Sequence, residues 1–182
     1  MSFIVLGVDQ SEGGNAGFAV VDLELSPPNN LVYTYLEEYR YTDKDGKEHR
    51  IPKSDKRTRC VRFALTLQRI IREYPPNALC TEIVRAYHHG QNNADTIAAL
   101  SRIEAVMFLV AKHVDIYEFN TASWQALFLK PKRGDNRKVL SIQAVKQYYG
   151  LAIPEHVCDA IWIASAFPYL KDNPSIHITE VL

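Results

Sequence analysis

Runs of apolar residues along the chain predict five strands. The first run, residues 3–8, is continuously apolar and ends at Asp9, which is typical of a strand buried on both faces. Turn-forming residues separate this run from alternating or apolar segments downstream. The other four strands are expected at residues 18–23, 31–39, 78–82 and 114–119.

Apolar residues at helical spacing predict the helices. One helix carries Val61, Leu65 and Ile70 on its apolar side and ends before Pro75, because proline cannot continue a helix. Polar loops are expected at residues 42–53, 85–92 and 130–138. The remaining helices are expected at residues 93–112, from 121 or 123 to 127, from the loop at 130–138 to 149, and at 155–169.

The order of these elements predicts one α/β domain spanning residues 1–182. Three meandering strands followed by parallel crossovers give a mixed five-stranded sheet with helices on both faces, the strand pattern of ribonuclease H-like folds. No apolar run has the length of a membrane span. The three cysteines form no CxxC pair and are expected to be buried thiols, which favours a reducing, cytoplasmic location.

The basic residues are concentrated in two segments, although the formal net charge of the chain is 0. Residues 44–72 hold ten basic and three acidic side chains, a net charge of +7, and residues 130–146 hold six and one, a net charge of +5. Charge separated in this way suits a protein that binds a polyanion at one surface. The second segment contains the candidate phosphate contacts Lys130, Lys132, Arg133, Arg137 and Lys138.

Three carboxylates occupy positions that ordinary surface acids rarely take. Asp9 and Glu82 each end a predicted buried strand, and Asp159 lies among apolar residues of the last helix. His156 precedes Asp159 by three residues, so both project from one helix face. If the first and fourth strands are neighbours, their ends bring Asp9 and Glu82 together, and a helix laid across that end adds Asp159.

Clustered carboxylates repel one another and therefore need a cation. Their hard oxygen ligands suit Mg²⁺, and two such ions can activate a water and stabilise the leaving oxygen of a phosphodiester. We expect two Mg²⁺ ions per site, for which Mn²⁺ can substitute, held by Asp9, Glu82, His156 and Asp159. His156 is either a metal ligand or a general base, because imidazole titrates near neutral pH.

These motifs together resemble the RuvC family of Holliday-junction resolvases, within the ribonuclease H-like superfamily. The resemblance follows the chain in order and rests on five matches. They are Gly7-Val8-Asp9, Gly17, Glu82 at the end of a strand, the stretch from Asn93 to Thr96 that opens a helix, and His156-Val-Cys-Asp159-Ala160.

The resemblance implies a metal-dependent endonuclease that cuts four-way DNA junctions with symmetric nicks. The twofold symmetry of the junction further implies a homodimer. Lys138 matches a lysine that the family places near the scissile phosphate. In the loop after Glu82, Arg85 and His88 are expected to contact DNA, and Tyr87 is the expected wedge at the junction centre, since an aromatic ring can stack on an unpaired base.

The chain also departs from the family pattern. Gln10-Ser11 replaces the usual Pro-Gly, the loop after Glu82 is longer, and residues 42–59 form an enlarged basic insertion. These departures would suit a phage-encoded or divergent member, which would act in the host cytoplasm. They affect substrate range more than the reaction.

Three other functions fit parts of the sequence. A ribonuclease H-like nuclease acting on RNA–DNA hybrids would use the same acids, whereas a non-catalytic branched-DNA-binding module would need them only as structural groups. An actin-like ATPase is disfavoured, because the chain is too short for two lobes and contains no GxxxxGK[ST] motif.

Trp124 is expected in the core rather than as a base-stacking residue.

Overall fold

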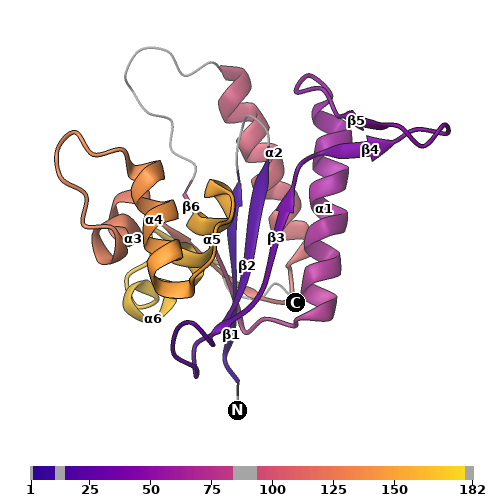
Figure 1. Cartoon of the computed structure of the whole chain (residues 1–182). Helices are drawn as coiled ribbons and strands as arrows, with labels where there is room; N and C mark the ends of the chain where they lie inside the picture. The colour runs from indigo at the N-terminus through magenta and orange to yellow at the C-terminus, as the bar shows by residue number, and fades with distance from the viewer. Residues whose placement is uncertain (1, 11–14, 84–93, 179–182) are drawn as a thin grey trace.

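In the computed structural model of the chain, which describes residues 2–10, 15–83 and 94–178, a six-stranded mixed sheet lies between two groups of helices (Figure 1). The strand order across the sheet is β3-β2-β1-β6-β7-β8. The strands of this sheet are β1 (Ile4–Gln10), β2 (Ala16–Asp22), β3 (Leu31–Glu37), β6 (Ala78–Glu82), β7 (Asp115–Phe119) and β8 (Ile176–Ile178). The helices are α1 (Lys56–Glu73), α2 (Ala94–Val110), α3 (Thr121–Phe128), α4 (Arg137–Tyr149), α5 (Glu155–Ser165) and α6 (Phe167–Leu170).

The pairing of the strands confirms the mixed α/β sheet. Strands β1, β2 and β3 form an antiparallel meander, and β1, β6 and β7 run parallel to one another. Parallel strands require crossover connections, which α1 and α2 supply on one face. The first and fourth strands predicted from the sequence, β1 and β6, are indeed neighbours.

Two apolar cores lie on opposite faces of the sheet. On one face Leu6 and Val8 pack with Phe63 of α1 and Met107 of α2. On the other face α5 supplies most of the cover, and its residues from Val157 to Ala164 are buried except Asp159. Figure 1 shows α3, α4, α5 and α6 together on this second side. Helix α5 is therefore the element that closes the face on which the candidate site lies.

Three expectations from the sequence were wrong in detail. The sheet has a sixth strand, β8, which pairs antiparallel with β7 and is too short for its alternation to be recognised in the sequence. The last helix is divided at Ala166, because Pro168 cannot donate the next backbone hydrogen bond of a helix. The predicted polar loop at 42–53 contains a hairpin of β4 (Arg40–Thr42) and β5 (Glu48–Arg50).

Within the described residues, none of the helices has both the length and the apolar character needed to cross a membrane.

Candidate active site

Asp9 and Glu82 lie side by side at the ends of two parallel strands. The register pairs Val8 with Thr81, so the next residues along β1 and β6 are the two acids. Alternation along the strands turns both side chains to the face covered by α5, the face that also holds Val5 and Cys80. The sheet therefore brings together two carboxylates that are 73 positions apart in the chain.

Helix α5 approaches this edge of the sheet because two glycines leave room for its backbone. A Cβ atom added to Gly17 would lie 1.9 Å from the carbonyl oxygen of His156, and one added to Gly7 would lie 2.0 Å from that of Ala160. Gly17 pairs with Asp9 across the two strands. The close approach therefore sets the start of α5 directly against Asp9, the residue before the last of β1.

His156 contacts Asp9 as a result of this packing. Its Nδ1 lies 2.6 Å from Oδ2 of Asp9, and the two side chains are 24% and 12% exposed. The hydrogen bond to Asp9 raises the pKa of His156, and the negative charges of Asp9, Glu155 and Asp159 raise it further. The imidazole is therefore held as a cation over a wider pH range than a free histidine, while part of it stays open to solvent.

Glu82 is held by two donors from α3. The indole Nε1 of Trp124 donates to Oε1 at 2.6 Å, and the hydroxyl of Thr121 donates to Oε2 at 3.1 Å. Burial, with the charge of Asp9 as the second cause, raises the pKa of Glu82 to about 7. Trp124 lies in the core as expected, but its polar edge also positions an acid of the site, a role that the sequence did not predict.

Asp159 occupies the face of α5 turned to α4. Its Oδ1 accepts a hydrogen bond from the hydroxyl of Ser141, which is buried in α4. Burial and then the charge of Asp9 raise the pKa of Asp159 to about 7. Ser141 and Thr121 were not candidates from the sequence, because an isolated hydroxyl residue on a helix carries no motif.

The predicted ligands come to one end of the sheet without forming a closed metal site. Within residues 2–10, 15–83 and 94–178, no group of three or more His, Cys, Asp or Glu side chains is arranged to hold a metal ion. Each acid instead has its own partner. Asp9 contacts His156, Glu82 accepts from Trp124 and Thr121, and Asp159 accepts from Ser141. Burial is the main cause that raises the pKa values of Glu82 and Asp159, and the charge of the neighbouring Asp9 is the second.

Lys138 reaches the margin of this cluster from the first turn of α4. Its Nζ lies 2.8 Å from Oε1 of Glu155, and its side chain is 69% exposed. The hydrogen bond to Glu155 is the main cause that raises the pKa of Lys138, and the charges of Asp159 and Asp9 add to it. The lysine is thus a cation beside the acids and accessible to a ligand from solvent.

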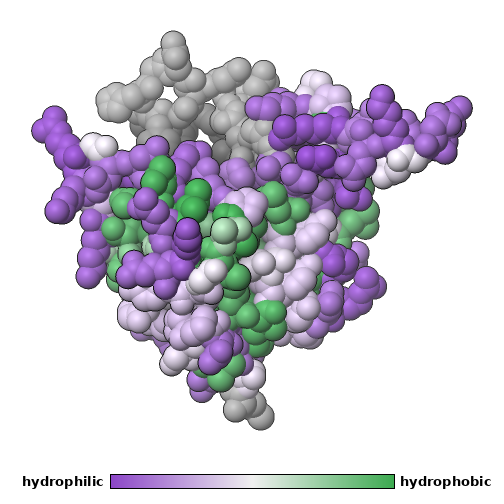
Figure 2. All heavy atoms as spheres, in the orientation of Figure 1, coloured by the Kyte–Doolittle hydropathy of each residue, from purple (hydrophilic) through white to green (hydrophobic). Residues whose placement is uncertain are grey.

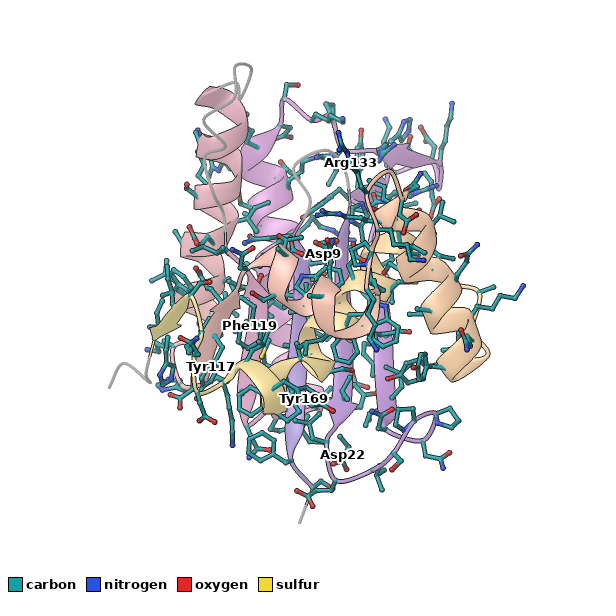
Figure 3. The ribbon with its side chains drawn as sticks, turned by 90° about the vertical axis from the view of Figure 1, so that its left-hand side faces the viewer. Asp9, Asp22, Tyr117, Phe119, Arg133 and Tyr169 are labelled. Atoms are coloured by element: carbon teal, nitrogen blue, oxygen red, sulfur yellow. The ribbon has the colours of Figure 1, made fainter. Side chains whose placement is uncertain are left out.

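The other cations of the second basic segment line the connection between α3 and α4. Figure 3 shows Arg133 in this connection, at the same end of the molecule as Asp9 and opposite to Asp22. Lys130, Lys132, Arg133 and Arg137 are all exposed. The guanidinium of Arg137 donates to Oε1 of Gln125 at 3.0 Å. Both residues and Lys130 line a surface pocket of about 340 Å³.

Some sequence candidates lie beyond the part of the chain that can be described. Arg85, Tyr87 and His88 fall within residues 84–93, outside the described residues.

Of the three cysteines, Cys80 and Cys158 are buried, as expected, and Cys60 is partly buried. Burial, and then the negative charge of Asp159, raises the pKa of the Cys158 thiol to about 12, so it stays protonated at neutral pH.

Comparison with solved structures identifies the fold. The chain matches Thermus thermophilus RuvC in complex with Holliday junction substrate at a TM-score of 0.62 and 19% identity, covering 93% of this chain and 95% of that one. A second Thermus thermophilus RuvC structure matches at a TM-score of 0.59 and 19% identity, covering 93% of this chain and 96% of that one. The yeast mitochondrial Holliday junction resolvase Ydc2 matches at a TM-score of 0.57 and 10% identity, covering 93% of this chain and 80% of that one.

The chain therefore has the ribonuclease H-like fold of RuvC, and the resemblance drawn from its motifs is confirmed at the level of the fold. No family model matches the sequence, and no curated protein matches it either.

Proposed function

We propose that this protein is a metal-dependent endonuclease that cuts four-way DNA junctions by hydrolysing one phosphodiester in each of two symmetric strands. The observation that carries the proposal is the meeting of Asp9, Glu82 and Asp159 at one end of the sheet, with His156 on Asp9. The fold is shared with proteins that are themselves Holliday-junction resolvases, one of them solved with a junction bound.

The donor chemistry of the site fits Mg²⁺. Three carboxyl groups supply hard oxygen ligands. Burial, and then the charge of Asp9, disfavours the ionised forms of Glu82 and Asp159, and a bound cation would stabilise those forms. Asp9, Glu82 and Asp159 would hold the metal, with His156 as a further ligand or as the base. When bound, two Mg²⁺ ions or Mn²⁺ in their place would supply an activated water and stabilisation of the leaving oxygen.

The residues around the acids have separable tasks. Trp124, Thr121 and Ser141 orient two of the carboxylates through hydrogen bonds. His156, if deprotonated, can take a proton from a water on its solvent-exposed side. Lys138 can neutralise charge on the phosphate that is cut, since it is exposed beside Glu155.

DNA binding is assigned to exposed cations rather than to base-reading groups. Lys130, Lys132, Arg133 and Arg137 would contact phosphate oxygens near the cut, and contacts of this kind fix position without reading sequence. Arg85, Tyr87 and His88 remain proposed contacts at the junction centre. Two copies of the chain would act on the two symmetric strands, as a homodimer in the cytoplasm.

One experiment separates this function from its alternatives. The protein is incubated with labelled four-way junction, linear duplex and RNA–DNA hybrid, each with Mg²⁺ and with EDTA, beside an Asp9→Asn control that reports contaminating nuclease. Paired nicks in the junction only, with Mg²⁺ only, support the proposal. Cutting of the hybrid alone would favour the ribonuclease alternative, and junction binding without any cutting would favour the binding module.

A further inference from the structure

Glu155 is a fourth carboxyl group at the active-site end of the molecule, beside the three acids that would hold the metal. It opens α5 directly before His156, and its side chain is 23% exposed. Its negative charge contributes to the raised pKa of both His156 and Asp159, so it lies within electrostatic reach of each. It was not a candidate from the sequence, because an acid in the first turn of a helix is common and interacts favourably with the helix dipole.

Both oxygens of Glu155 contact the ammonium group of Lys138. The Nζ atom of Lys138 lies 2.8 Å from Oε1 and 3.2 Å from Oε2 of Glu155. The backbone of Lys138 is fixed as well, because its N–H donates to Oδ1 of Asn136, the N-cap of α4. The start of α4 and the carboxylate on α5 thus hold the two ends of a long, flexible side chain.

This contact is one of three that join α4 to α5. The hydroxyl of Ser141 donates to Asp159, and the indole Nε1 of Trp162 donates to the carbonyl of Ser141 at 3.4 Å. Lys138 and Ser141 are three residues apart on α4, and Glu155 and Asp159 are four apart on α5, so each pair lies on one face of its helix. Figure 1 shows the two helices side by side, and Figure 2, in the same view, shows hydrophilic residues over the connection that leads into α4. The lysine contact therefore belongs to the helix interface that also holds Asp159.

Stability alone does not account for an acid at this position. An exposed ion pair contributes little to the stability of a fold, because water screens its charges, and the side chain of Lys138 is 69% exposed. The charge of Glu155 also disfavours the ionised form of Asp159, whose pKa it helps to raise. What this carboxylate does fix is the place of the Lys138 ammonium group at the margin of the acids.

Lys138 can bind a phosphate while it stays on Glu155. A lysine ammonium group has three N–H donors. The two contacts to Glu155 use at most two of them, and the exposed side of the group leaves the remaining donor accessible from solvent. The charges of Glu155, Asp159 and Asp9 all contribute to the raised pKa of Lys138, so the group stays a cation there.

We propose that Glu155 is a positioning residue, which holds the ammonium group of Lys138 where it meets the phosphate that is cut. This inference rests on the proposed function and adds to it a residue that neither touches the substrate nor binds the metal. A free lysine side chain loses rotamer freedom when it is fixed on a ligand, and Glu155 removes that freedom before DNA arrives. The ion pair thus favours the reaction through preorganisation rather than through the stability of the fold.

The first measurement follows the Lys138 ammonium group directly, in protein with EDTA. Nitrogen NMR of the lysine Nζ atoms reports how ordered each side chain is, and a Lys138→Arg variant assigns the signal by its loss. We expect the Nζ of Lys138 to be ordered in the wild type and mobile in Glu155→Gln. The exposed Lys146 on the same helix is the internal control and should not change. Adding a four-way junction should shift the Lys138 signal of the wild type.

The second measurement is single-turnover cutting of a four-way junction with Mg²⁺, at protein concentrations that saturate binding. Glu155→Gln should cut about 10- to 100-fold more slowly, since a small displacement of a catalytic group can cause a loss of this size. Its junction affinity should stay the same or rise, because the change removes a negative charge beside a polyanion. Glu73→Gln, which breaks the exposed ion pair with Arg69 on α1, is the matched control and should cut like the wild type.

A double-mutant cycle separates positioning of the lysine from other effects of the Glu155 charge. Lys138→Ala should slow cutting by about 100-fold, as expected for the loss of one electrostatic contact at a reacting centre. Glu155→Gln should then cause no further loss in the Lys138→Ala protein, because there is no ammonium group left to position. Thermal unfolding of each variant confirms that it is folded.

Three results would overturn the inference. They are a Lys138 Nζ that is equally ordered in the wild type and in Glu155→Gln, a Glu155→Gln protein that cuts at the wild-type rate, and equal slowing by Glu155→Gln with and without Lys138. Failure of the proposed function is seen separately, as a wild type that does not cut with Mg²⁺. The spectra in EDTA then decide the inference: a Lys138 signal that Glu155 orders and the junction shifts supports it, and one that the junction does not shift refutes it.

Discussion

The carbonyl oxygen of His156 occupies the space that a side chain on Gly17 would need. A Cβ on Gly17 would lie only 1.9 Å from that oxygen. Because Gly17 of β2 has no side chain, the start of α5 can approach the sheet closely. This approach sets the distance between His156 and Asp9.

Gly17→Ala should displace the start of α5 and disturb the site. Overpacking of a close contact costs about 1–3 kcal/mol, so the free energy of unfolding should fall by at least this amount. Cutting should also fall in protein that is still folded. Ile70→Ala, which opens a cavity in the core on the other face, is the matched control. If both variants lose activity only in proportion to unfolding, the close approach of α5 has no separate role in catalysis.

Asp9→Asn, Glu82→Gln and Asp159→Asn should each reduce junction cutting by at least about 100-fold while junction binding persists. Each change removes one negative charge from the group that would hold the metal, and loss of one electrostatic contact at a reacting centre has effects of this size. Single-turnover cutting and gel-shift binding measure the two properties. Asp22→Asn, at the other end of β2, should cut normally. An acid variant that cuts at the wild-type rate is not part of the site.

His156→Ala should slow cutting far more than it weakens binding, and His156→Asp should retain part of the activity, because the RuvC resemblance places an acid at this position. The pKa of His156 is raised, so the wild-type rate should fall as the pH is lowered through that pKa and the imidazole becomes protonated. Rates measured from pH 6 to 9 test this. An alanine variant with the full wild-type rate over that range would make His156 a surface residue.

The protein without divalent cations should be more stable at pH 5 than at pH 8. Glu82 and Asp159 have folded-state pKa values of about 7, above their unfolded values, so they bind protons on folding. Their contribution is present below the unfolded pKa and is lost as the pH rises through about 7. His156, whose pKa is also raised, has the same sign. Each of the two carboxyl groups is ionised in the unfolded chain at pH 5 and is protonated in the folded protein up to about pH 7, a span of about two pKa units. At 1.36 kcal/mol per unit, the combined change should be roughly 5 kcal/mol.

Thermal unfolding across this pH range, with and without Mg²⁺, measures that effect. Mg²⁺ should raise the melting temperature at pH 8 much more than at pH 5, where protons already relieve the repulsion. Burial also raises the pKa of Glu118 to about 8, so a Glu118→Gln variant removes that background. Equal stabilisation by Mg²⁺ at both pH values would place its binding outside this cluster.

Lys130→Gly should separate DNA binding from stability. Lys130 has a φ of 45° just after α3, a position where helices usually place glycine. Glycine should therefore hold or raise the free energy of unfolding by up to about 1 kcal/mol, whereas Lys130→Ala keeps the strain. Both variants should weaken junction binding equally and make the salt slope shallower by about 0.9. Unchanged binding in both would show that the lysine only faces solvent.

The sequence by itself determined the local elements and the positions of the acids. Two apolar runs end in Asp9 and Glu82, and one apolar helix contains Asp159. Each of these patterns spans only a few residues, so it can be recognised in the sequence alone. The meeting of Asp9 and Glu82 was predicted on the condition that the first and fourth strands are neighbours, and the register of β1 and β6 shows that they are. The fold class was predictable from the order of the elements.

Only the tertiary structure decided how the acids are held. His156 and Asp9 are 147 positions apart, and Trp124 lies 42 positions from Glu82. Trp124, Thr121 and Ser141 are residue types that occur on any helix, and their roles depend on which strand end they face. The hairpin β4–β5 was missed because both its faces are polar, and its place is set by Tyr39, Ile51 and Arg59 packing together. Contacts between distant residues are chosen by packing of the whole chain, which no local pattern encodes.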